Sequence, residues 1–346
     1  MANEFALTLL RWFRENGRDL PWRQTRDPYA IWLSEIILQQ TQVKQGWAYW
    51  ERFMQKWPTV EQLAAATEDE VLRMWQGLGY YSRARNLHFA ARQIVAMGGF
   101  PQTLEGIKSL KGVGDYTAAA IGSFAFDLPA AVVDGNVYRV LSRHFGISTP
   151  INTTEGKKEF ALLAQELLPT ANTQQPTANS QQPIPNTQHP TADYNQSIMD
   201  FGATQCTPSN PDCPDCPLIE SCLAFREHRV DALPVKLKTL KVKERALTYV
   251  YVRYQGETAI HRRGEGDIWQ GLYEPLLTDQ VPDGAVLLRQ GVKHVLTHRI
   301  LKADFWLWQP AERPALPADY LWIKETELDE FAKPRLIEIL LETLNS

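Results

Sequence analysis

The chain has 346 residues, of which 44% are hydrophobic and 22% are charged, and its formal net charge is −4. This composition is ordinary for a globular protein of about two domains and excludes a disordered or collagen-like chain. No apolar run approaches the length of about 20 residues that spans a membrane, and the N-terminus lacks a secretory pattern. We therefore expect a cytoplasmic protein that has no contact with a membrane.

The first half of the chain has the pattern of short helices. From residue 4 to about residue 168, periodic segments are interrupted by turn signals rich in glycine and proline. Thr59 and Thr67 each precede a segment with acidic or amide side chains in its first turn, which is typical of helix caps. These features predict an all-α body with short connections.

One acidic residue in this part lies in apolar surroundings. Glu35 is the only charged residue between Asp27 and Lys44, and isoleucine, leucine and tryptophan surround it. An apolar environment disfavours the ionised carboxylate, so Glu35 can remain protonated near neutral pH, as a general acid requires. The alternative is an ordinary surface glutamate on an amphipathic helix.

A glycine-containing turn follows between two helical stretches. In the sequence Leu-Lys-Gly-Val-Gly, Gly112 and Gly114 permit positive φ angles and a close backbone approach. The amides that open the next helix could then bind a phosphate, although a plain tight turn explains the same pattern. Asp134 lies twenty residues further on, where it can cap a helix over residues 137–144. Basic side chains outnumber acidic ones, eight to four, between residues 71 and 144; they could contact DNA or form a solvated surface.

A proline-containing repeat with a period of seven interrupts the helical pattern. Prolines recur at 169, 176, 183 and 190, separated by small and polar residues. Such a composition cannot bury a core, so we expect a low-complexity insertion at about residues 169–193, in the form of a surface loop.

All four cysteines lie within seventeen residues, at Cys206, Cys213, Cys216 and Cys222. In a reducing compartment, this clustering indicates a metal site rather than disulfides. Four thiolates can bind either zinc or an iron–sulfur cluster. The uneven spacing, with a single Cys-x2-Cys pair, favours the iron–sulfur alternative.

The pattern changes after a connector at residues 226–244. Residues 248–254 and 259–262 are expected to form a hairpin around a turn at residues 255–257. Further strands are predicted at residues 292–296, 302–309 and 320–323, with a closing helix at residues 334–344. Residues 245–346 should therefore form an α+β domain.

Taken together, the motifs resemble those of the helix–hairpin–helix DNA glycosylases, the endonuclease III superfamily. The resemblance rests on the Gly112–Gly114 turn with Asp134 and on the Cys-x6-Cys-x2-Cys-x5-Cys spacing. Segments 32–43, 76–86 and 199–206 look like the MutY family of adenine glycosylases. The resemblance implies an all-α helix–hairpin–helix glycosylase core, with its hairpin at about residues 103–125 and a [4Fe–4S] cluster loop at 206–222. This domain would span residues 1–225, followed by a linker at 226–244 and a C-terminal α+β Nudix-like lesion-recognition domain at 245–346.

The resemblance also assigns roles to residues. Glu35 would donate a proton to the adenine ring, Asp134 would stabilise the oxocarbenium-like sugar, and Tyr116 would assist near that sugar. Bifunctional relatives carry a lysine where this chain has Tyr116. Because tyrosine cannot form an imine, we expect a monofunctional enzyme.

Further residues are assigned by the same resemblance. Gln196 offers both a donor and an acceptor to adenine. The adenine pocket would contain Trp22, Arg23 and Gln196, the DNA would be contacted by Gln40, Thr41, Leu78, Tyr80, Gly112 and Gly114, and 8-oxoguanine would be recognised by Thr297 and His298. The family commonly has serine where Thr297 stands, so the affinity for the lesion can differ. Residues 245–346 lack the dense Arg-Glu-x-x-Glu-Glu helix of Nudix hydrolases, so we expect no catalysis there.

The predicted function is therefore the hydrolytic removal of adenine mispaired with 8-oxoguanine or guanine in double-stranded DNA, by base flipping. The resemblance further implies a monomer that is associated with the nucleoid. Two alternatives remain open from the sequence. One is a pyrimidine-lesion glycosylase with lyase activity, and the other is a damage sensor that binds DNA without catalysis.

Overall fold

The computed structural model describes residues 2–169, 188–238 and 242–345. It divides into two compact units, each assembled from two stretches of the chain. The first unit combines Met1–Gly46 with Gln93–Lys238, and the second combines Trp47–Arg92 with Thr239–Ser346. The domain boundaries expected from the sequence stay a prediction.

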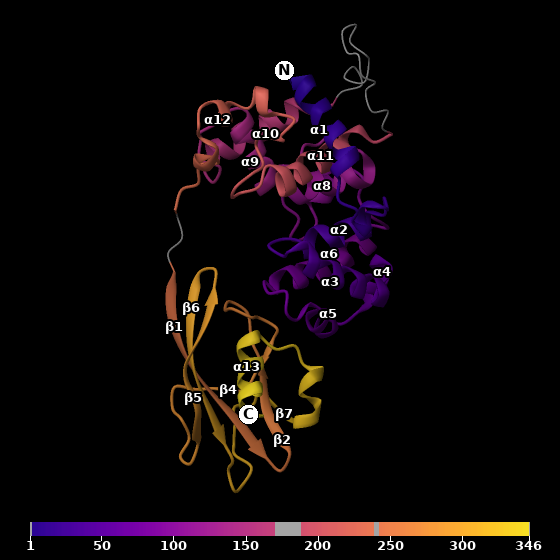
Figure 1. Cartoon of the computed structure of the whole chain (residues 1–346). Coiled ribbons are helices and arrows are strands. Elements are labelled where there is room, and N and C mark those ends of the chain that lie inside the picture. Colours follow the sequence, from indigo (N-terminus) through magenta and orange to yellow (C-terminus); the bar gives the residue numbers. More distant parts are fainter. Residues whose placement is uncertain (1, 170–187, 239–241, 346) are drawn as a thin grey trace. The chain divides into compact units, whose positions relative to one another are not determined.

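The first unit is helical throughout the residues that the structure describes (Figure 1). Its helices are α1 (Ala2–Asn16), η1 (Pro21–Arg23), α2 (Pro28–Ile37), α7 (Leu104–Lys108), α8 (Asp115–Phe126), α9 (Gly135–His144), α10 (Thr154–Glu166), α11 (Pro190–Asp200), the π-helical turn η3 (Phe201–Gln205), η4 (Ile219–Ser221), α12 (Leu223–Arg226) and η5 (Val230–Ala232). The predicted all-α body is confirmed. No helix in the described ranges has the length and apolarity needed to cross a membrane.

Helices α2 and α8 form the buried centre of this unit. Asp27 caps α2 by accepting a hydrogen bond from the Tyr29 amide, and Pro28 occupies the first helical turn. Every residue of α2 from Tyr29 to Ile37 is buried, as is every residue of α8 from Thr117 to Ala125. A helix that is buried on all sides holds each of its side chains in the core. The single acidic residue of α2, Glu35, is therefore placed inside the protein.

The end of the predicted insertion differs from the structure. Helix α11 begins at Pro190, so residues 190–193 are helical and do not belong to a loop. A proline lacks a backbone N–H, which the first helical position does not need, and its fixed φ suits the start of a helix. The last proline of the repeat therefore starts a helix. Residues 170–187 of the predicted insertion lie outside the described residues.

The second unit joins helices to a β-sheet. Its helices are α3 (Val43–Lys56) and α6 (Ser82–Ala96), which extend into the first unit, and α4 (Val60–Ala65), α5 (Glu68–Trp75), η6 (Glu325–Glu330) and α13 (Arg335–Leu344). Thr59 and Thr67 cap α4 and α5, as predicted. The strands are β1 (Lys243–Tyr254), β2 (Glu257–Arg262), β3 (Tyr273–Glu274), β4 (Leu276–Leu277), β5 (Val286–Leu296), β6 (Arg299–Trp308) and β7 (Tyr320–Lys324).

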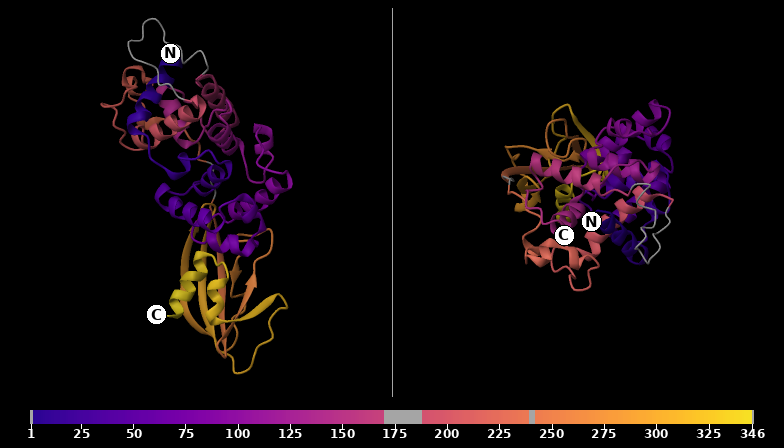
Figure 2. Two further views of the ribbon diagram at one scale, coloured as in Figure 1. Left: turned by 90° about the vertical axis from the view of Figure 1, so that its right-hand side faces the viewer. Right: turned by 90° about the horizontal axis from the view of Figure 1, so that it is seen from above.

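Strand β1 is the centre of the sheet, whose order is β3-β2-β1-β6-β5. It pairs with β6 in parallel and with β2 through an antiparallel hairpin whose turn residues Gln255 and Gly256 have positive φ angles. Helix α13 packs its apolar residues Leu336 and Leu340 against the sheet residue Tyr249, and Figure 2 shows this helix lying along the strands. The predicted α+β domain is confirmed; the two-residue strands β3 and β4 were not predicted.

Candidate active site

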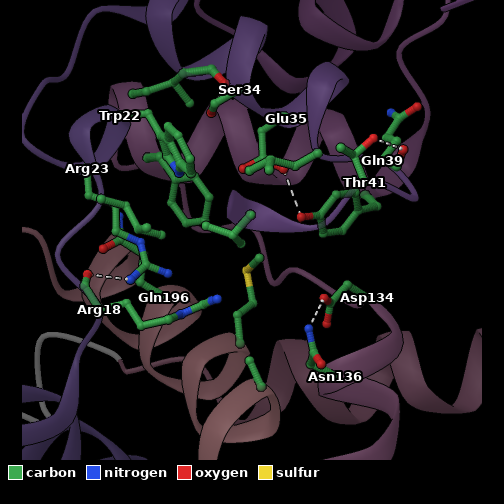
Figure 3. Close-up of a pocket in the computed structure, with 18 residues that line it drawn as sticks. Arg18, Trp22, Arg23, Ser34, Glu35, Gln39, Thr41, Asp134, Asn136 and Gln196 are labelled. Atoms are coloured by element: carbon green, nitrogen blue, oxygen red, sulfur yellow. Dashed lines mark hydrogen bonds between the residues drawn. The ribbon is translucent and has the colours of Figure 1, made fainter. Parts of the chain in front are cut away.

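A cavity of about 320 Å³ opens among the helices of the first unit (Figure 3). This volume lies near the lower end of the range of about 300–1,000 Å³ that is usual for small-molecule sites. Its lining comprises Arg18, Leu20, Trp22, Arg23, Ile31, Ser34, Glu35, Leu38, Gln39, Thr41, Val43, Tyr116, Phe124, Asp134, Asn136, Gln196, Met199 and Ala203. The cavity therefore brings together all three predicted catalytic residues and all three predicted adenine-pocket residues.

Glu35 lies in the wall of this cavity with only 7% of its surface exposed. Burial is the largest influence on its carboxyl group and raises its pKa to about 7, although the hydrogen bond from Tyr116 opposes this effect. The Tyr116 hydroxyl donates to Glu35 Oε2 over 2.8 Å. A carboxyl group with this pKa can hold a proton at neutral pH and release it during a reaction.

Asp134 faces the same cavity and also caps helix α9. Its Oδ1 accepts a hydrogen bond of 2.8 Å from the Val137 amide, which confirms the predicted cap. Its Oδ2 accepts a 2.8 Å bond from Asn136 Nδ2. Burial raises the pKa of Asp134 above its ordinary value, while these two hydrogen bonds act in the opposite direction. The negative charge of Asp134 also helps to raise the pKa of Glu35, so the two carboxyl groups interact across one site.

A second wall of the cavity is built from ion pairs. Asp200, at the end of α11, is completely buried and accepts hydrogen bonds from both Arg18 and Arg23. Gln196 lies one helical turn before Asp200 and is half-buried at the cavity. Figure 3 shows the Gln196 side chain extending into the space beside Arg18 and Arg23. This wall therefore presents fixed polar groups to a ligand, opposite in chemical character to the apolar surroundings of Glu35.

The predicted phosphate-binding turn connects α7 to α8. Gly112 has a φ of +79°, which only glycine adopts readily. Gly114 is different, because its φ is −95° and it serves as the N-cap of α8. Of the two glycines that permit positive φ angles, Gly112 adopts one and Gly114 does not. The binding of a phosphate by the amide groups at the start of α8 stays a prediction.

The predicted DNA-contacting side chains differ in exposure. In the first unit, Gln40 is exposed with a φ of +56°, and Thr41 lines the cavity. In the second unit, Tyr80 is 46% exposed with a φ of +46°, whereas Leu78 is only 8% exposed. Burial of Leu78 makes Tyr80 the better candidate of the two for a side chain that contacts DNA.

Thr297 and His298 form the turn between β5 and β6, and both are exposed. They line a cavity of about 540 Å³ in the second unit together with Tyr80 and Trp269. The hydroxyl groups of Tyr80 and Thr297 are hydrogen-bonded to each other. One cavity of the second unit therefore brings together three residues, Tyr80, Thr297 and His298, that were predicted from the sequence to contact DNA.

The four cysteines are free and half-buried. Burial is the largest of the influences that raise the pKa of the Cys216 thiol to about 12, and the electrostatic effect of the other three cysteines acts in the same direction. Among the described residues, however, no group of three or more side chains is arranged to hold a metal ion. The cluster therefore stays a prediction.

Two buried arginines of α9 secure this cysteine loop. Arg143 donates from Nη1 to Cys206 Sγ at 3.4 Å and to the Thr207 carbonyl at 2.7 Å. Arg139 donates from Nε to the Cys206 carbonyl at 2.7 Å and from Nη2 to Asn136 Oδ1 at 2.9 Å. Helix α9 is thus hydrogen-bonded to the cysteine loop at one side and carries Asp134 at its N-terminus.

Comparison with known families agrees with both parts of this fold. Residues 33–169 match the family model of the HhH-GPD superfamily base excision DNA repair protein, and residues 248–343 match that of the NUDIX domain. An adenine DNA glycosylase of Buchnera aphidicola subsp. Schizaphis graminum is 34% identical over 272 residues, which cover 78% of this chain and 73% of the relative. The chain belongs to the adenine DNA glycosylase family.

Other similar proteins define the extent of the likeness. The adenine DNA glycosylase of Rattus norvegicus is 42% identical over 244 residues, and this chain covers 66% of its own length but 44% of that relative. The structure of a thermostable thymine-DNA glycosylase has a TM-score of 0.56 and 30% identity, covering 65% of this chain and 97% of that one. A non-covalent endonuclease III–DNA complex has a TM-score of 0.52 at 19% identity, covers 66% of this chain and 98% of that one, and shows the helical fold alone.

In this member of the adenine DNA glycosylase family, sequence reasoning missed the polar pocket side chains of Arg18 and Asn136, and also Asp200, which pairs with Arg18. Asn136 lies two residues after Asp134, so its contact could have been anticipated from the local sequence. Arg18 and Asp200 are separated by 182 residues, and no local pattern links them. Long-range ion pairs of this kind become visible only when the helices are folded together.

Proposed function

We propose that the protein is a monofunctional adenine DNA glycosylase of base excision repair that hydrolyses the bond between adenine and deoxyribose. The adenine would be paired with 8-oxoguanine or guanine. Membership of the adenine DNA glycosylase family supports the reaction class. The observation that carries the chemistry is the buried Glu35 carboxyl, whose pKa of about 7 suits a proton donor at neutral pH.

The reaction begins when the adenine is flipped out of the duplex into the cavity beside Glu35. Glu35 Oε2 accepts the Tyr116 hydroxyl, which leaves Oε1 to carry the acidic proton. Transfer of this proton to a ring nitrogen makes the base a better leaving group. The bond between C1′ and the base then breaks, and its electron pair moves to the base. Water adds to C1′ and releases a proton that restores Glu35 to its acidic form.

Asp134 is proposed to stabilise the positive charge that develops on the sugar. An anion close to an oxocarbenium-like sugar lowers the energy of the transition state. The developing cation also favours the ionised form of Asp134, against the effect of burial on its pKa. Tyr116 stands where a lyase needs an amine, so hydrolysis without strand cleavage is expected.

The polar wall of the cavity is proposed to select adenine. Trp22 offers an aromatic surface for the flipped base, while Gln196 can donate to and accept from the amino edge of adenine. Arg23 lines the same cavity. Around the pocket, the DNA would be gripped through its backbone and wedged open at the flipped base; the residues proposed for these contacts are Gln40, Thr41, Tyr80, Gly112 and Gly114.

Recognition of the opposite base is proposed for the second unit. The exposed Thr297 and His298 are candidates to contact 8-oxoguanine, with Tyr80 beside them. Leu78, proposed from the sequence as an alternative wedge, is buried and takes no part in this proposal.

The four cysteines are proposed to hold a [4Fe–4S] cluster. Their clustering within seventeen residues of the sequence and the Arg143 donor at Cys206 Sγ fit an anionic thiolate-bound group. The cluster would organise the loop that packs on α9. A visible spectrum of anaerobically purified protein, together with iron, sulfide and zinc analysis, tests this assignment. Zinc at one equivalent without iron would contradict it.

The proposed reaction is tested with purified protein on three duplexes, containing adenine opposite 8-oxoguanine, adenine opposite guanine, and thymine opposite guanine. We expect release of adenine from the first two and no release of thymine. Thymine release would instead favour the specificity named for the similar glycosylase structure.

Two further measurements separate the remaining alternatives. Borohydride added during the reaction should trap no covalent protein–DNA adduct, whereas a pyrimidine-lesion lyase would be trapped. A single-turnover assay on the adenine duplexes should show base release at a measurable rate. Tight binding of duplex without any base release would indicate a damage sensor.

A further inference from the structure

The strongest unassigned feature of the pocket is the carboxylate of Asp200. It is wholly buried and accepts five hydrogen bonds from two arginines. Arg18 donates from its backbone amide at 2.8 Å, from Nε at 2.8 Å and from Nη2 at 2.5 Å. Arg23 donates from Nη1 and Nη2, each at 2.7 Å. These contacts lower the pKa of Asp200 even though burial acts to raise it, so the group is a permanent anion.

Arg23, one of the two arginines bonded to Asp200, lines the same cavity as Glu35. Both of its terminal nitrogen atoms bond to Asp200, and Nη1 also bonds to the Arg18 carbonyl at 3.1 Å (Figure 3). The guanidinium of Arg23 is thereby directed to Asp200. A guanidinium released from these bonds would lie in a small cavity that also contains the carboxyl groups of Glu35 and Asp134, with which it could pair.

The groups that act on Glu35 come from three elements around α2. They are Tyr116 from α8, Asp134 from the turn before α9, and Arg23 from η1. Among these groups only Arg23 is a cation, and it is the one that acts on Glu35 through positive charge. An opposite charge within about 4–6 Å lowers the pKa of a carboxyl group by about 1–3 units. The positive charge of Arg23 therefore acts against the protonated form of Glu35, which burial, the largest influence on its pKa, favours.

We propose that Asp200 is a positioning residue that binds the Arg23 guanidinium and neutralises its charge, so that Glu35 stays protonated for catalysis. This inference rests on the proposed function, in which Glu35 is the proton donor. It assigns Asp200 no contact with the DNA or the base. It differs from a purely structural role because it predicts a change in the proton affinity of Glu35.

The test measures single-turnover base release as a function of pH for Asp200→Asn, Arg23→Gln and the wild type. A rate that requires protonated Glu35 falls as pH rises through the pKa of that group. Asp200→Asn leaves the charge of Arg23 uncompensated, so the midpoint should move down by about one pH unit or more. At a pH above the wild-type midpoint the rate should then fall about tenfold or more.

Arg23→Gln should move the pH midpoint in the opposite direction. It removes the cation and leaves Asp200 charged, so the midpoint should move up even if base binding is weaker. Glu274→Gln is the matched control, because Glu274 is another buried carboxylate that pairs with an arginine, Arg263, but lies in the second unit. Its midpoint should equal that of the wild type. If Asp200→Asn does not fold, the upward shift of Arg23→Gln remains the test.

The pKa of Glu35 can also be read without catalysis, by a ¹³C NMR titration of carboxyl-labelled glutamate in the DNA-free protein, with Glu35→Gln identifying the signal. The proposal is overturned if Asp200→Asn folds and keeps both the wild-type midpoint and the wild-type titration, or if Arg23→Gln moves neither upward. A wild type that releases no adenine contradicts the proposed function instead, and the titration then still tests the role of Asp200.

Discussion

Two buried glutamates in this protein have nearly the same immediate neighbour and opposite surroundings. In the first unit, Glu35 accepts the Tyr116 hydroxyl at 2.8 Å; in the second, Glu274 accepts the Tyr249 hydroxyl at 2.8 Å. Glu274 is also paired with the guanidinium of Arg263, whereas Glu35 forms no ion pair with any residue that the structure describes. A carboxylate with an adjacent cation keeps its charge and serves the fold; one without a cation can exchange its proton and serve a reaction.

The first prediction concerns Glu35, the glutamate proposed to act in catalysis. Replacing Glu35 by Gln keeps the shape of the side chain and removes its acidic proton. We expect single-turnover base release to fall by about 10²–10⁴-fold, because general acid catalysis contributes about that much. The measurement is the rate of adenine release from an adenine:8-oxoguanine duplex at saturating protein.

Binding of the same duplex should persist in this variant, as measured by fluorescence anisotropy with a non-cleavable adenine analogue. Excision at the wild-type rate would remove Glu35 from its proposed role. A simultaneous loss of binding and folding would point to a structural role for this side chain.

The second prediction concerns Glu274, the glutamate that is paired with Arg263. Glu274→Gln leaves Arg263 buried without its closest carboxylate, and loss of one partner from a buried ion pair costs about 3–5 kcal/mol. Asp267 also pairs with Arg263, at 2.6 Å, which holds the expected loss to the lower end of that range. Urea unfolding measures it, and base release by the folded variant should remain close to that of the wild type. An unchanged unfolding free energy would show that Asp267 alone satisfies Arg263.

The third prediction concerns how stability depends on pH. The pKa of Glu35 is raised from 4.5 to about 7 in the folded protein. The folded state therefore binds a proton more tightly than the unfolded state, so Glu35 makes the protein less stable as pH rises from about 4.5 to about 7. Glutamine at this position does not titrate. The unfolding free energy of Glu35→Gln relative to the wild type should increase by about 3 kcal/mol across this window and stay constant above it.

Urea unfolding of both proteins at pH 5, 6, 7 and 8 measures this difference. Subtracting one protein from the other removes the contribution of groups common to both, apart from their coupling to Glu35. A difference that does not change between pH 5 and pH 8 would mean that Glu35 is ionised in the folded protein at neutral pH, contrary to the proposed chemistry.

The sequence predicted much of the site because the informative features were local. The apolar neighbours of Glu35 belong to its own helix, and Asp134 caps the helix that directly follows it in the sequence. The hairpin of β1 and β2 was likewise predicted from alternating residues around one turn. Local patterns of this kind involve residues that are neighbours in the sequence, so they can be recognised before the fold is known.

What the sequence could not predict depends on distant parts of the chain. The Arg18–Asp200 pair joins residues 182 positions apart, and the burial of Leu78 depends on the packing of its whole unit. The start of α11 at Pro190 was missed for a different reason, since the repeat pattern continued to that residue and concealed a helix start.

The smallest expected effect concerns a third tyrosine, Tyr80, whose hydroxyl bonds to Thr297. Here both partners are neutral and exposed, so the bond should contribute only about 0.5–1.5 kcal/mol. A double-mutant cycle of Tyr80→Phe and Thr297→Ala, followed by urea unfolding, measures this coupling directly. Thr297→Ser is the control, because it keeps the hydroxyl and should keep the coupling. A coupling of several kcal/mol would contradict the view that charge and burial, rather than the tyrosine itself, determine what these three hydroxyl contacts do.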